Sequence, residues 1–478
     1  MGASALASRY DLVIIGMGSG GMVGAEFAAT IGLRVAVVER GRVGGDCLWT
    51  GCVPSKALLA SAKAAHTMRV ADKYGLPSID PVDIDTSLVW KRIRAIQQDL
   101  AGTDDDPERF KAMGVEVIAG QARITGPNAV ELVGQDRTLE TRFILLCTGS
   151  RPLTPPIEGL KEAGFLTSES VFEIERAPKS MVMIGGGPIA IEMAQAFTRL
   201  GIRTTVLQKG PGILPRDEPD LVATLTAMLR NEGVDLRLNV ETERVAVAEG
   251  RKIVYGAEAG VPAKWEGEEL LVAVGRRPNV EGLGLDEVGV KVGRRGIEVD
   301  ERMRTSVPSI YAAGDVAGRF LFTHSAAYEA VRAVRDAFYP GKGKVTDFVP
   351  WCTFTDPELA HAGLTVAEAE KKHGDDVEVY RMELAHSDRA RADSASEGCI
   401  VVVTAKGKLV GAHILAPSAG EMIHELAMGI NEGMKLAELA SLIHVYPTLS
   451  TSIGQLAGEA AFEGAKRLRW LVRKEKQQ

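Results

Sequence analysis

The chain has 478 residues and a formal net charge of −7, from 56 Lys and Arg residues against 63 Asp and Glu residues. This length exceeds what a single hydrophobic core usually serves and predicts about three domains. The basic residues are scattered along an acidic chain, which excludes the dense basic face that nucleic-acid binding requires. No apolar run approaches the ~20 residues of a membrane span, and the N-terminus lacks the pattern of a secretory signal, so we expect no membrane span and a cytoplasmic location.

The first predicted element is an apolar strand, Tyr10–Ile15, which leads through a glycine-rich turn into a helix from Met22 to Ile31. Three glycines occupy this turn at the spacing that lets a backbone approach a pyrophosphate: Gly16, Gly18 and Gly21. A second strand from Arg34 to Val38 ends at Glu39, whose carboxylate can accept hydrogen bonds from a ribose. Strand, turn, helix and acid in this order predict a dinucleotide site.

The next informative segment holds two cysteines, Cys47 and Cys52, five positions apart. Pro54 is tolerated in the first turn of a helix, so Cys52 is expected at or just before the positive end of a helix. Such an end stabilises a thiolate, and Lys56 on the same helix face supplies a cation. The spacing predicts a redox-active disulfide, and a static structural bridge is the alternative.

A second strand, turn and helix follow, beginning with the strand Met181–Ile184 and returning through the strand Thr204–Leu207. Its turn carries three small residues at matching positions: Gly185, Gly187 and Ala190. Gln208 stands 23 residues after the first glycine of its turn, as Glu39 does in the first copy. Neutral Gln208 followed by Lys209 would not repel a 2′-phosphate, which favours NADPH over NADH. A solvated lysine at the strand end is the alternative reading of Lys209.

Two nucleotide turns with a dithiol between them are the arrangement of one flavoprotein family. The chain resembles the pyridine nucleotide-disulfide oxidoreductases (class I flavoprotein disulfide reductases), most closely their mercuric reductase-like and dihydrolipoamide dehydrogenase-like members. Four further segments are similar to motifs of that family and extend the resemblance over nearly the whole chain: residues 146–150, 273–279, 305–315 and 351–358.

The resemblance implies an α/β fold with two Rossmann-like dinucleotide-binding domains, for FAD and for NAD(P), and a C-terminal α+β dimerisation domain. We expect the FAD domain to be discontinuous, at 1–152 and 277–345, around an NAD(P)H domain at 153–276. The dimerisation domain is expected at 346–467 and a basic C-terminal tail at 468–478. By the same resemblance the protein is a homodimer in which residues of the partner complete each active site.

The resemblance also assigns positions to the cofactors. Those expected to bind FAD are Gly16, Gly18, Gly21, Glu39, Thr148, Gly149 and Asp315. Those expected to bind NADPH, with NADH as the alternative, are Gly185, Gly187, Ala190, Gln208, Lys209 and Gly275. No metal site is expected, since the remaining cysteines, at 147, 352 and 399, have no ligand-like spacing.

The implied chemistry passes electrons from NADPH through FAD to a Cys47–Cys52 disulfide. Cys52 would lie against the flavin as the charge-transfer thiolate, and Cys47 would attack an oxidised substrate. Lys56 would lie near the flavin and pair with Glu192, for which a solvated helix residue is the alternative reading.

The C-terminal segment departs from the disulfide-reducing members, which carry a His-x-His-Pro motif and a later glutamate. Here Tyr446 replaces the second histidine and Thr451 replaces the glutamate, while His444 is retained. A phenol has a pKa near 10 where imidazole has about 6.5, so tyrosine is the poorer base at neutral pH. We therefore expect slow oxidation of dihydrolipoamide. Pro447 favours extended backbone before it, which would place His444 and Tyr446 on the same side, and either is a candidate for proton transfer.

These features predict an FAD-dependent NAD(P)H oxidoreductase, mercuric reductase-like, whose acceptor is a small disulfide, a metal ion or a quinone. One alternative is a dihydrolipoamide dehydrogenase that serves a multienzyme complex. Another is a flavoprotein redox sensor or subunit that does not turn over.

Overall fold

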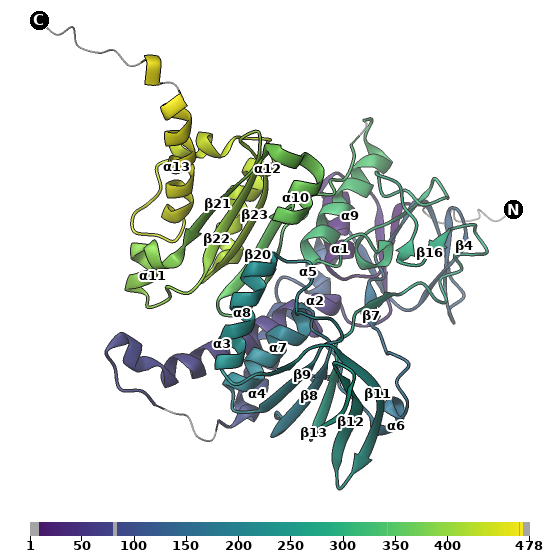
Figure 1. Cartoon of the computed structure of the whole chain (residues 1–478). Helices are drawn as coiled ribbons and strands as arrows, with labels where there is room; N and C mark the ends of the chain where they lie inside the picture. Colours follow the sequence, from purple (N-terminus) through teal and green to yellow (C-terminus); the bar gives the residue numbers. More distant parts are fainter. Residues whose placement is uncertain (1–8, 80–83, 342, 468, 472–478) are drawn as a thin grey trace, which may run out of the picture.

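The computed structural model describes residues 9–79, 84–341, 343–467 and 469–471 (Figure 1). The basic tail predicted at 468–478 therefore lies outside the described residues, apart from the short turn η6 (Arg469–Leu471). No helix in the described ranges combines the length and the apolar character needed to cross a membrane.

The first unit is built on a seven-stranded sheet with the order β3-β2-β1-β6-β5-β4, in which β18 also pairs with β6. The strands are β1 (Tyr10–Ile15), β2 (Val35–Glu39), β3 (Glu116–Ala119), β4 (Ala122–Gly126), β5 (Ala129–Leu132), β6 (Thr138–Leu146) and β18 (Ile310–Ala312). β1 pairs in parallel with β2 and β6, and β18 pairs in parallel with β6. Residues from before and after the second unit thus share one sheet. The domain limits of 1–152 and 277–345 stay predictions.

Helices α1 (Ser19–Thr30) and α9 (Thr323–Phe338) pack together against this sheet (Figure 1). α1 begins three residues earlier than the sequence pattern indicated. In α1 the reason is the close approach of the turn, because a Cβ on Gly21 would lie 1.9 Å from the carbonyl oxygen of Gly16. The glycines form the first helical turn as well as the bend before it.

The second unit repeats the plan with a parallel four-stranded sheet of order β10-β9-β8-β14. Its strands are β8 (Ser180–Ile184), β9 (Arg203–Leu207), β10 (Asp235–Arg237) and β14 (Glu269–Val272), with helices α7 (Pro188–Arg199) and α8 (Pro219–Asn231). A three-stranded antiparallel sheet accompanies it, formed by β11 (Val240–Ala248), β12 (Arg251–Glu258) and β13 (Val261–Gly267). The chain leaves and re-enters the first unit through the antiparallel pair β7 (Ser150–Pro152) and β15 (Arg276–Pro278).

The C-terminal unit is a five-stranded antiparallel sheet with the order β19-β20-β23-β22-β21. Its strands are β19 (Trp351–Thr353), β20 (Glu358–Gly363), β21 (Val377–Glu383), β22 (Cys399–Ala405) and β23 (Lys408–Ala416). Its helices are α10 (Val366–His373), α11 (Asp388–Ala392), α12 (Ala419–Asn431) and α13 (Thr451–Arg467). The parallel strands repeated in the first two units and this α+β unit confirm the predicted fold class.

Two helices connect these units. α3 (Cys52–Arg69) and α4 (Thr86–Ala101) lie beside α7, and Trp90 stacks on Phe197 with ring centroids 5.9 Å apart (Figure 1). One buried apolar cluster runs from α3 through α7 to β22. Because this core fixes the body of α3, it also fixes the position of the residue at its N-terminus, Cys52.

The remaining short elements are α2 (Gly45–Trp49), α5 (Pro107–Ala112), α6 (Leu160–Ala163), β16 (Val292–Gly293), β17 (Gly296–Ile297), η1 (Ala71–Tyr74), η2 (Gly314–Ala317), η3 (Gly374–Asp376), η4 (Leu384–His386) and η5 (Leu436–Ser441).

Candidate active site

A cavity of about 1950 Å³ extends between the two glycine turns and along the dithiol. Fifteen of the predicted site residues line it: Gly16, Gly18, Glu39, Cys47, Cys52, Lys56, Thr148, Gly149, Gly185, Gly187, Glu192, Gln208, Lys209, Gly275 and Asp315. Four do not: Gly21, Ala190, His444 and Tyr446. Gly21 and Ala190 lie inside their helices instead, where small side chains permit close packing.

The cavity has the backbone surfaces that two dinucleotides require. At Gly149, Gly187 and Gly275 an added Cβ would meet no heavy atom within 4 Å, so the main chain there borders open space. At Gly16 and Gly185 the backbone has a positive φ, and a Cβ would lie 2.4 Å from a carbonyl oxygen of the neighbouring segment. Each glycine turn therefore leads its strand into a helix N-terminus that faces the cavity, which suits a pyrophosphate.

Glu39 at the end of β2 and Gln208 just after β9 would make different contacts with a bound ribose. The Glu39 carboxylate accepts hydrogen bonds from the backbone N–H groups of Met17 and Gly41, each at 2.6 Å. These bonds fix it beside the first glycine turn. Gln208 donates to the carbonyl oxygen of Gly212 at 3.0 Å and lies against the second turn. Lys209 beside it is exposed. The end of β2 therefore carries the negative charge of Glu39, whereas the end of β9 carries the neutral Gln208 followed by the positively charged Lys209.

The dithiol lies where the short helix α2 meets the N-terminus of the longer helix α3. Cys47 belongs to α2 and Cys52 is the first residue of α3, as the sequence predicted, and both are free thiols. A hydrogen bond from Cys47 is the largest influence that lowers the pKa of Cys52 to about 6, with help from the Thr323 hydroxyl at 3.3 Å and the charge of Lys56. The same contact raises the pKa of Cys47. At neutral pH the reduced pair therefore carries one negative charge, on Cys52.

Lys56 and Glu192 form an ion pair behind this thiolate. The Lys56 Nζ lies 3.0 Å from Glu192 Oε2, and the other carboxylate oxygen accepts the backbone N–H of Phe354 at 2.9 Å. The Phe354 ring also covers the ammonium, with Nζ 4.2 Å from the ring centroid. Glu192 is only 5% exposed, so it is not a solvated helix residue. Its role in the reaction stays a prediction.

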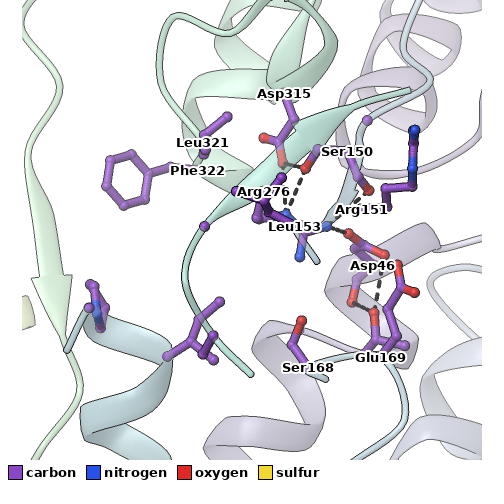
Figure 2. A pocket seen from close by; sticks show the side chains of 18 of the residues that line it. Asp46, Ser150, Arg151, Leu153, Ser168, Glu169, Arg276, Asp315, Leu321 and Phe322 are labelled. Atoms are coloured by element: carbon purple, nitrogen blue, oxygen red, sulfur yellow. Dashed lines mark hydrogen bonds and ion pairs between the residues drawn. The ribbon is translucent and has the colours of Figure 1, made fainter. Parts of the chain in front are cut away.

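An arginine that was not among the predicted site residues connects α2, which carries Cys47, to Asp315 of the segment 305–315. Arg276 lies between Asp46 on one side and Ser150 with Asp315 on the other (Figure 2). Its Nε donates to the Ser150 hydroxyl at 2.6 Å, which in turn donates to Asp315 at 2.5 Å. Burial raises the pKa of Asp315. Arg276 stood inside a recognised segment, but its partners come from three distant parts of the chain.

Comparison with known proteins agrees with this geometry. A family model for pyridine nucleotide-disulphide oxidoreductases matches residues 10–330, and the model of that family's dimerisation domain matches residues 349–457. The chain is a member of this oxidoreductase family. Members use FAD and NAD(P)H, and the cavity residues described above fit both.

Named relatives span nearly the whole chain. A dihydrolipoyl dehydrogenase of Thermus scotoductus is 36% identical over 467 residues, covering 94% of this chain and 96% of the relative. A mercuric reductase of Streptomyces lividans is 33% identical over 455 residues, covering 93% and 94%. The Cu(II) complex of RclA, an HOCl-induced flavoprotein disulfide reductase of Escherichia coli, has a TM-score of 0.84 at 27% identity, covering 95% and 99%.

The C-terminal segment is the part of this family member that differs from the sequence expectation. His444 is turned inward, with Nε2 3.0 and 3.2 Å from the carboxylate oxygens of Glu425 on α12. Tyr446 is 67% exposed, and its hydroxyl donates to Asp388 at 2.8 Å. The expectation that the two side chains share one side was therefore wrong, because each finds its own carboxylate in a different direction.

No group of three or more His, Cys, Asp or Glu residues within the described ranges is arranged to hold a metal ion. Thr323, which contacts Cys52 from α9, was also missed by the sequence analysis. It lies 271 residues further along the chain, and no local pattern marks it.

Removing the hydroxyl of Thr323 tests how Cys52 is ionised. We expect Thr323→Val to raise the pKa of Cys52 by about 0.5 to 1 unit, since one hydrogen bond contributes about 1 kcal/mol. The measurement is a pH titration of thiolate absorbance in the reduced protein. Thr323→Ser retains the hydroxyl and serves as the control, and equal titrations of the two variants would contradict this account.

Proposed function

We propose that this protein is a cytoplasmic homodimer that passes electrons from NADPH, through FAD and the Cys47–Cys52 pair, to a small acceptor: a disulfide, a metal ion or a quinone. The observation that carries the proposal is the placement of Cys52, with Cys47 beside it, at the N-terminus of α3 and in the lining of the cavity that both glycine turns border. A pair that must open and close in each cycle also suits a reducing compartment.

Cys52, Cys47 and Lys56 have separate roles at the cavity. Bound FAD would supply a two-electron carrier between the reduced nicotinamide and the disulfide. Cys52 holds the negative charge of the reduced pair, while Cys47 keeps its proton. With a disulfide as acceptor, the Cys47–Cys52 bond forms, the acceptor's S–S bond breaks, and one thiol and one thiolate leave. Lys56 stays close enough to stabilise Cys52 whenever it is ionised.

The preference for NADPH rests on the end of β9. A carboxylate at this point would repel the 2′-phosphate, whereas Gln208 is neutral and the exposed Lys209 carries a positive charge into the same cavity. NADH remains the alternative donor, because neither residue obstructs a ribose that lacks the phosphate.

A dihydrolipoyl dehydrogenase is the second candidate, and the comparisons favour it by name, since the first relatives all carry that name at up to 36% identity. The C-terminal segment argues against it. Thiol oxidation needs a base at the position of Tyr446, and the nearby imidazole of His444 is held inward by Glu425.

An acceptor screen tests the proposal as a whole. Purified protein is offered NADPH or NADH with oxidised lipoamide, glutathione disulfide, Hg(II) and a benzoquinone, and nucleotide absorbance is followed. We expect sustained turnover with at least one acceptor, lost by about 100-fold in Cys47→Ser and Cys52→Ser. Cys399→Ala is the control, because Cys399 is buried in β22 away from the cavity. Oxidation of a single equivalent of nucleotide would indicate a redox sensor instead.

Placing a carboxylate at the end of β9 tests the nucleotide preference. We expect Gln208→Glu to lower kcat/KM for NADPH by about tenfold relative to NADH, because a repulsion of about 1.4 kcal/mol corresponds to that factor. Lys264→Gln changes the net charge of the same unit equally at an exposed site of β13 and should leave the ratio unchanged. An unaltered ratio in Gln208→Glu would remove the argument for NADPH.

Restoring the base tests the choice between the two candidates. We expect Tyr446→His combined with Thr451→Glu to increase dihydrolipoamide oxidation with NAD⁺ by at least about tenfold, since imidazole titrates about three units below a phenol. Tyr446→Phe with Thr451→Glu lacks a base and should give no increase. Fast turnover by the unaltered protein, with no gain in the double variant, would favour dihydrolipoyl dehydrogenase.

A further inference from the structure

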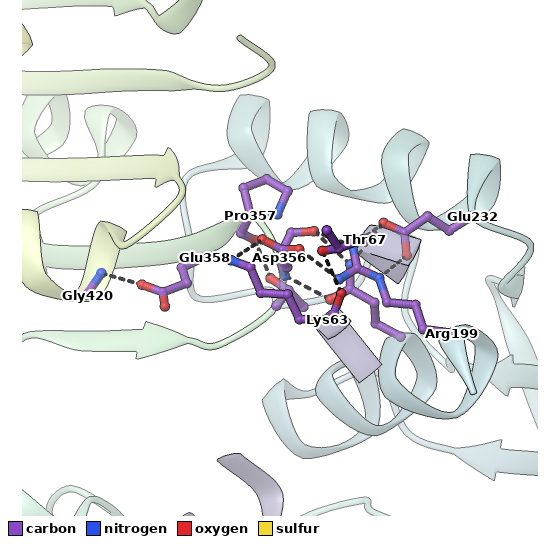
Figure 3. A network of polar contacts seen from close by, with 10 residues as sticks. Lys63, Thr67, Arg199, Glu232, Asp356, Pro357, Glu358 and Gly420 are labelled. Atoms are coloured by element: carbon purple, nitrogen blue, oxygen red, sulfur yellow. Dashed lines mark hydrogen bonds and ion pairs between the residues drawn. The ribbon is translucent and has the colours of Figure 1, made fainter. Parts of the chain in front are cut away.

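A short segment of the C-terminal unit, residues 354–358, forms hydrogen bonds to both helices of the ion pair: α3, which begins at Cys52 and carries Lys56, and α7, which carries Glu192. The segment runs from the end of β19 to the first residue of β20 and borders both α3 and α7 (Figure 3). Asp356 is its centre. One oxygen of its carboxylate accepts a hydrogen bond from Lys63 of α3 at 3.1 Å, and the other accepts one from Arg199 of α7 at 2.8 Å.

The side-chain amide of Gln195 forms hydrogen bonds with both main-chain groups of Asp356, its N–H and its carbonyl oxygen. Its Oε1 accepts the Asp356 N–H at 2.8 Å, and its Nε2 donates to the Asp356 carbonyl oxygen at 2.8 Å. Gln195 is 1% exposed, so these bonds are formed away from water. A buried amide that satisfies both its donor and its acceptor on one peptide segment fixes the position of that segment.

Arg199 completes the contact from the next turn of α7. Its guanidinium also forms two bonds of 2.7 Å to Glu232, and its side chain is 4% exposed. Burial alone would raise the pKa of Asp356, yet Arg199 and Lys63 hold that pKa below its usual range. The positive charges of Arg199 and Lys63 thus compensate the negative charges of Asp356 and Glu232. Removal of one of these side chains would leave an opposite charge without its partner.

The same segment ends at the ion pair behind the dithiol. Glu192, Gln195 and Arg199 follow one another along a single face of α7, at helical spacings of three and four. Phe354, two residues before Asp356, donates its N–H to Glu192 and covers Lys56 with its ring. At the other end, Glu358 accepts the N–H of Gly420 near the start of α12, at 2.8 Å (Figure 3).

We propose that Gln195, Arg199 and Asp356 are positioning residues that hold Phe354 in place, and that Phe354 in turn keeps the Glu192–Lys56 pair oriented toward Cys52. They touch neither the dithiol nor a cofactor site and act through Phe354 alone. In this way the C-terminal unit controls the reactivity of a thiol that belongs to the first unit.

The expected direction follows from the groups that influence Cys52. Cys47 of α2 and Thr323 of α9 stabilise its thiolate by hydrogen bonds, Lys56 of α3 stabilises it by charge, and Glu192 of α7 opposes it. The favourable effect of Lys56 exceeds the unfavourable effect of Glu192. If Phe354 moves away, water screens both charges and the net stabilisation of the thiolate falls.

The test titrates Cys52 in two variants that loosen the segment. Gln195→Met keeps the size of the side chain and removes its hydrogen bonds, and Asp356→Asn removes the charge while keeping the backbone contacts of Gln195. Both are made in the Cys47→Ser holoprotein, and the ultraviolet absorbance of the Cys52 thiolate is followed against pH. We expect each midpoint to rise by about half a unit, a roughly threefold smaller thiolate-to-thiol ratio at a given pH.

Asp220→Asn is the matched control, since it breaks an exposed ion pair with Arg381 that joins the same two units without touching residues 354–358. No shift in either Gln195→Met or Asp356→Asn, or an equal shift in Asp220→Asn, would overturn the inference. The inference rests on the proposed function of the dithiol. The titration needs no turnover, so failure of the acceptor screen and failure of this test are separate results.

Discussion

Ionisation of Cys52 is the property on which the chemistry of this site depends, because only the thiolate stabilises charge beside a flavin or exchanges with a disulfide. Three elements provide it. The N-terminus of α3 faces the sulfur, Cys47 of α2 donates a hydrogen bond, and Thr323 of α9 lies 3.3 Å away. The partition of one proton between the two sulfurs follows, with the pKa of Cys52 lowered to about 6 and that of Cys47 raised.

The cavity is shared by all three units, and this explains why a charged pair can be buried in it. Glu192 is nearly inaccessible to solvent, and a carboxylate there would be costly without Lys56 and the backbone N–H of Phe354. Phe354 belongs to the C-terminal unit, Lys56 to the first and Glu192 to the second. The ion pair therefore exists only where the three units meet. Arg276, where the chain re-enters the first unit, instead joins Asp46 and Asp315 of that unit.

The C-terminal segment shows how one replacement changes the role of its neighbours. The family's disulfide-reducing members, by resemblance, present a histidine where this chain has Tyr446. Here the phenol is exposed and bound to Asp388, while His444 is held by Glu425. The relatives named dihydrolipoyl dehydrogenase share the scaffold at 31 to 36% identity. The same scaffold thus carries different side chains at this segment, and a shared fold does not by itself fix the reaction.

The sequence by itself determined the features that depend on local spacing: both glycine turns, the acid at Glu39, the start of a helix at Cys52 and the α/β class. These follow from φ/ψ restrictions and from the order of strand, turn and helix, which act over a few residues. Only the tertiary structure decided the contacts of Thr323, Arg276, Phe354 and Asp356, and the separate partners of His444 and Tyr446. Their partners lie up to 298 residues away, as for Phe354 and Lys56, or on a helix face that packing alone selects, so no periodicity in the chain encodes them.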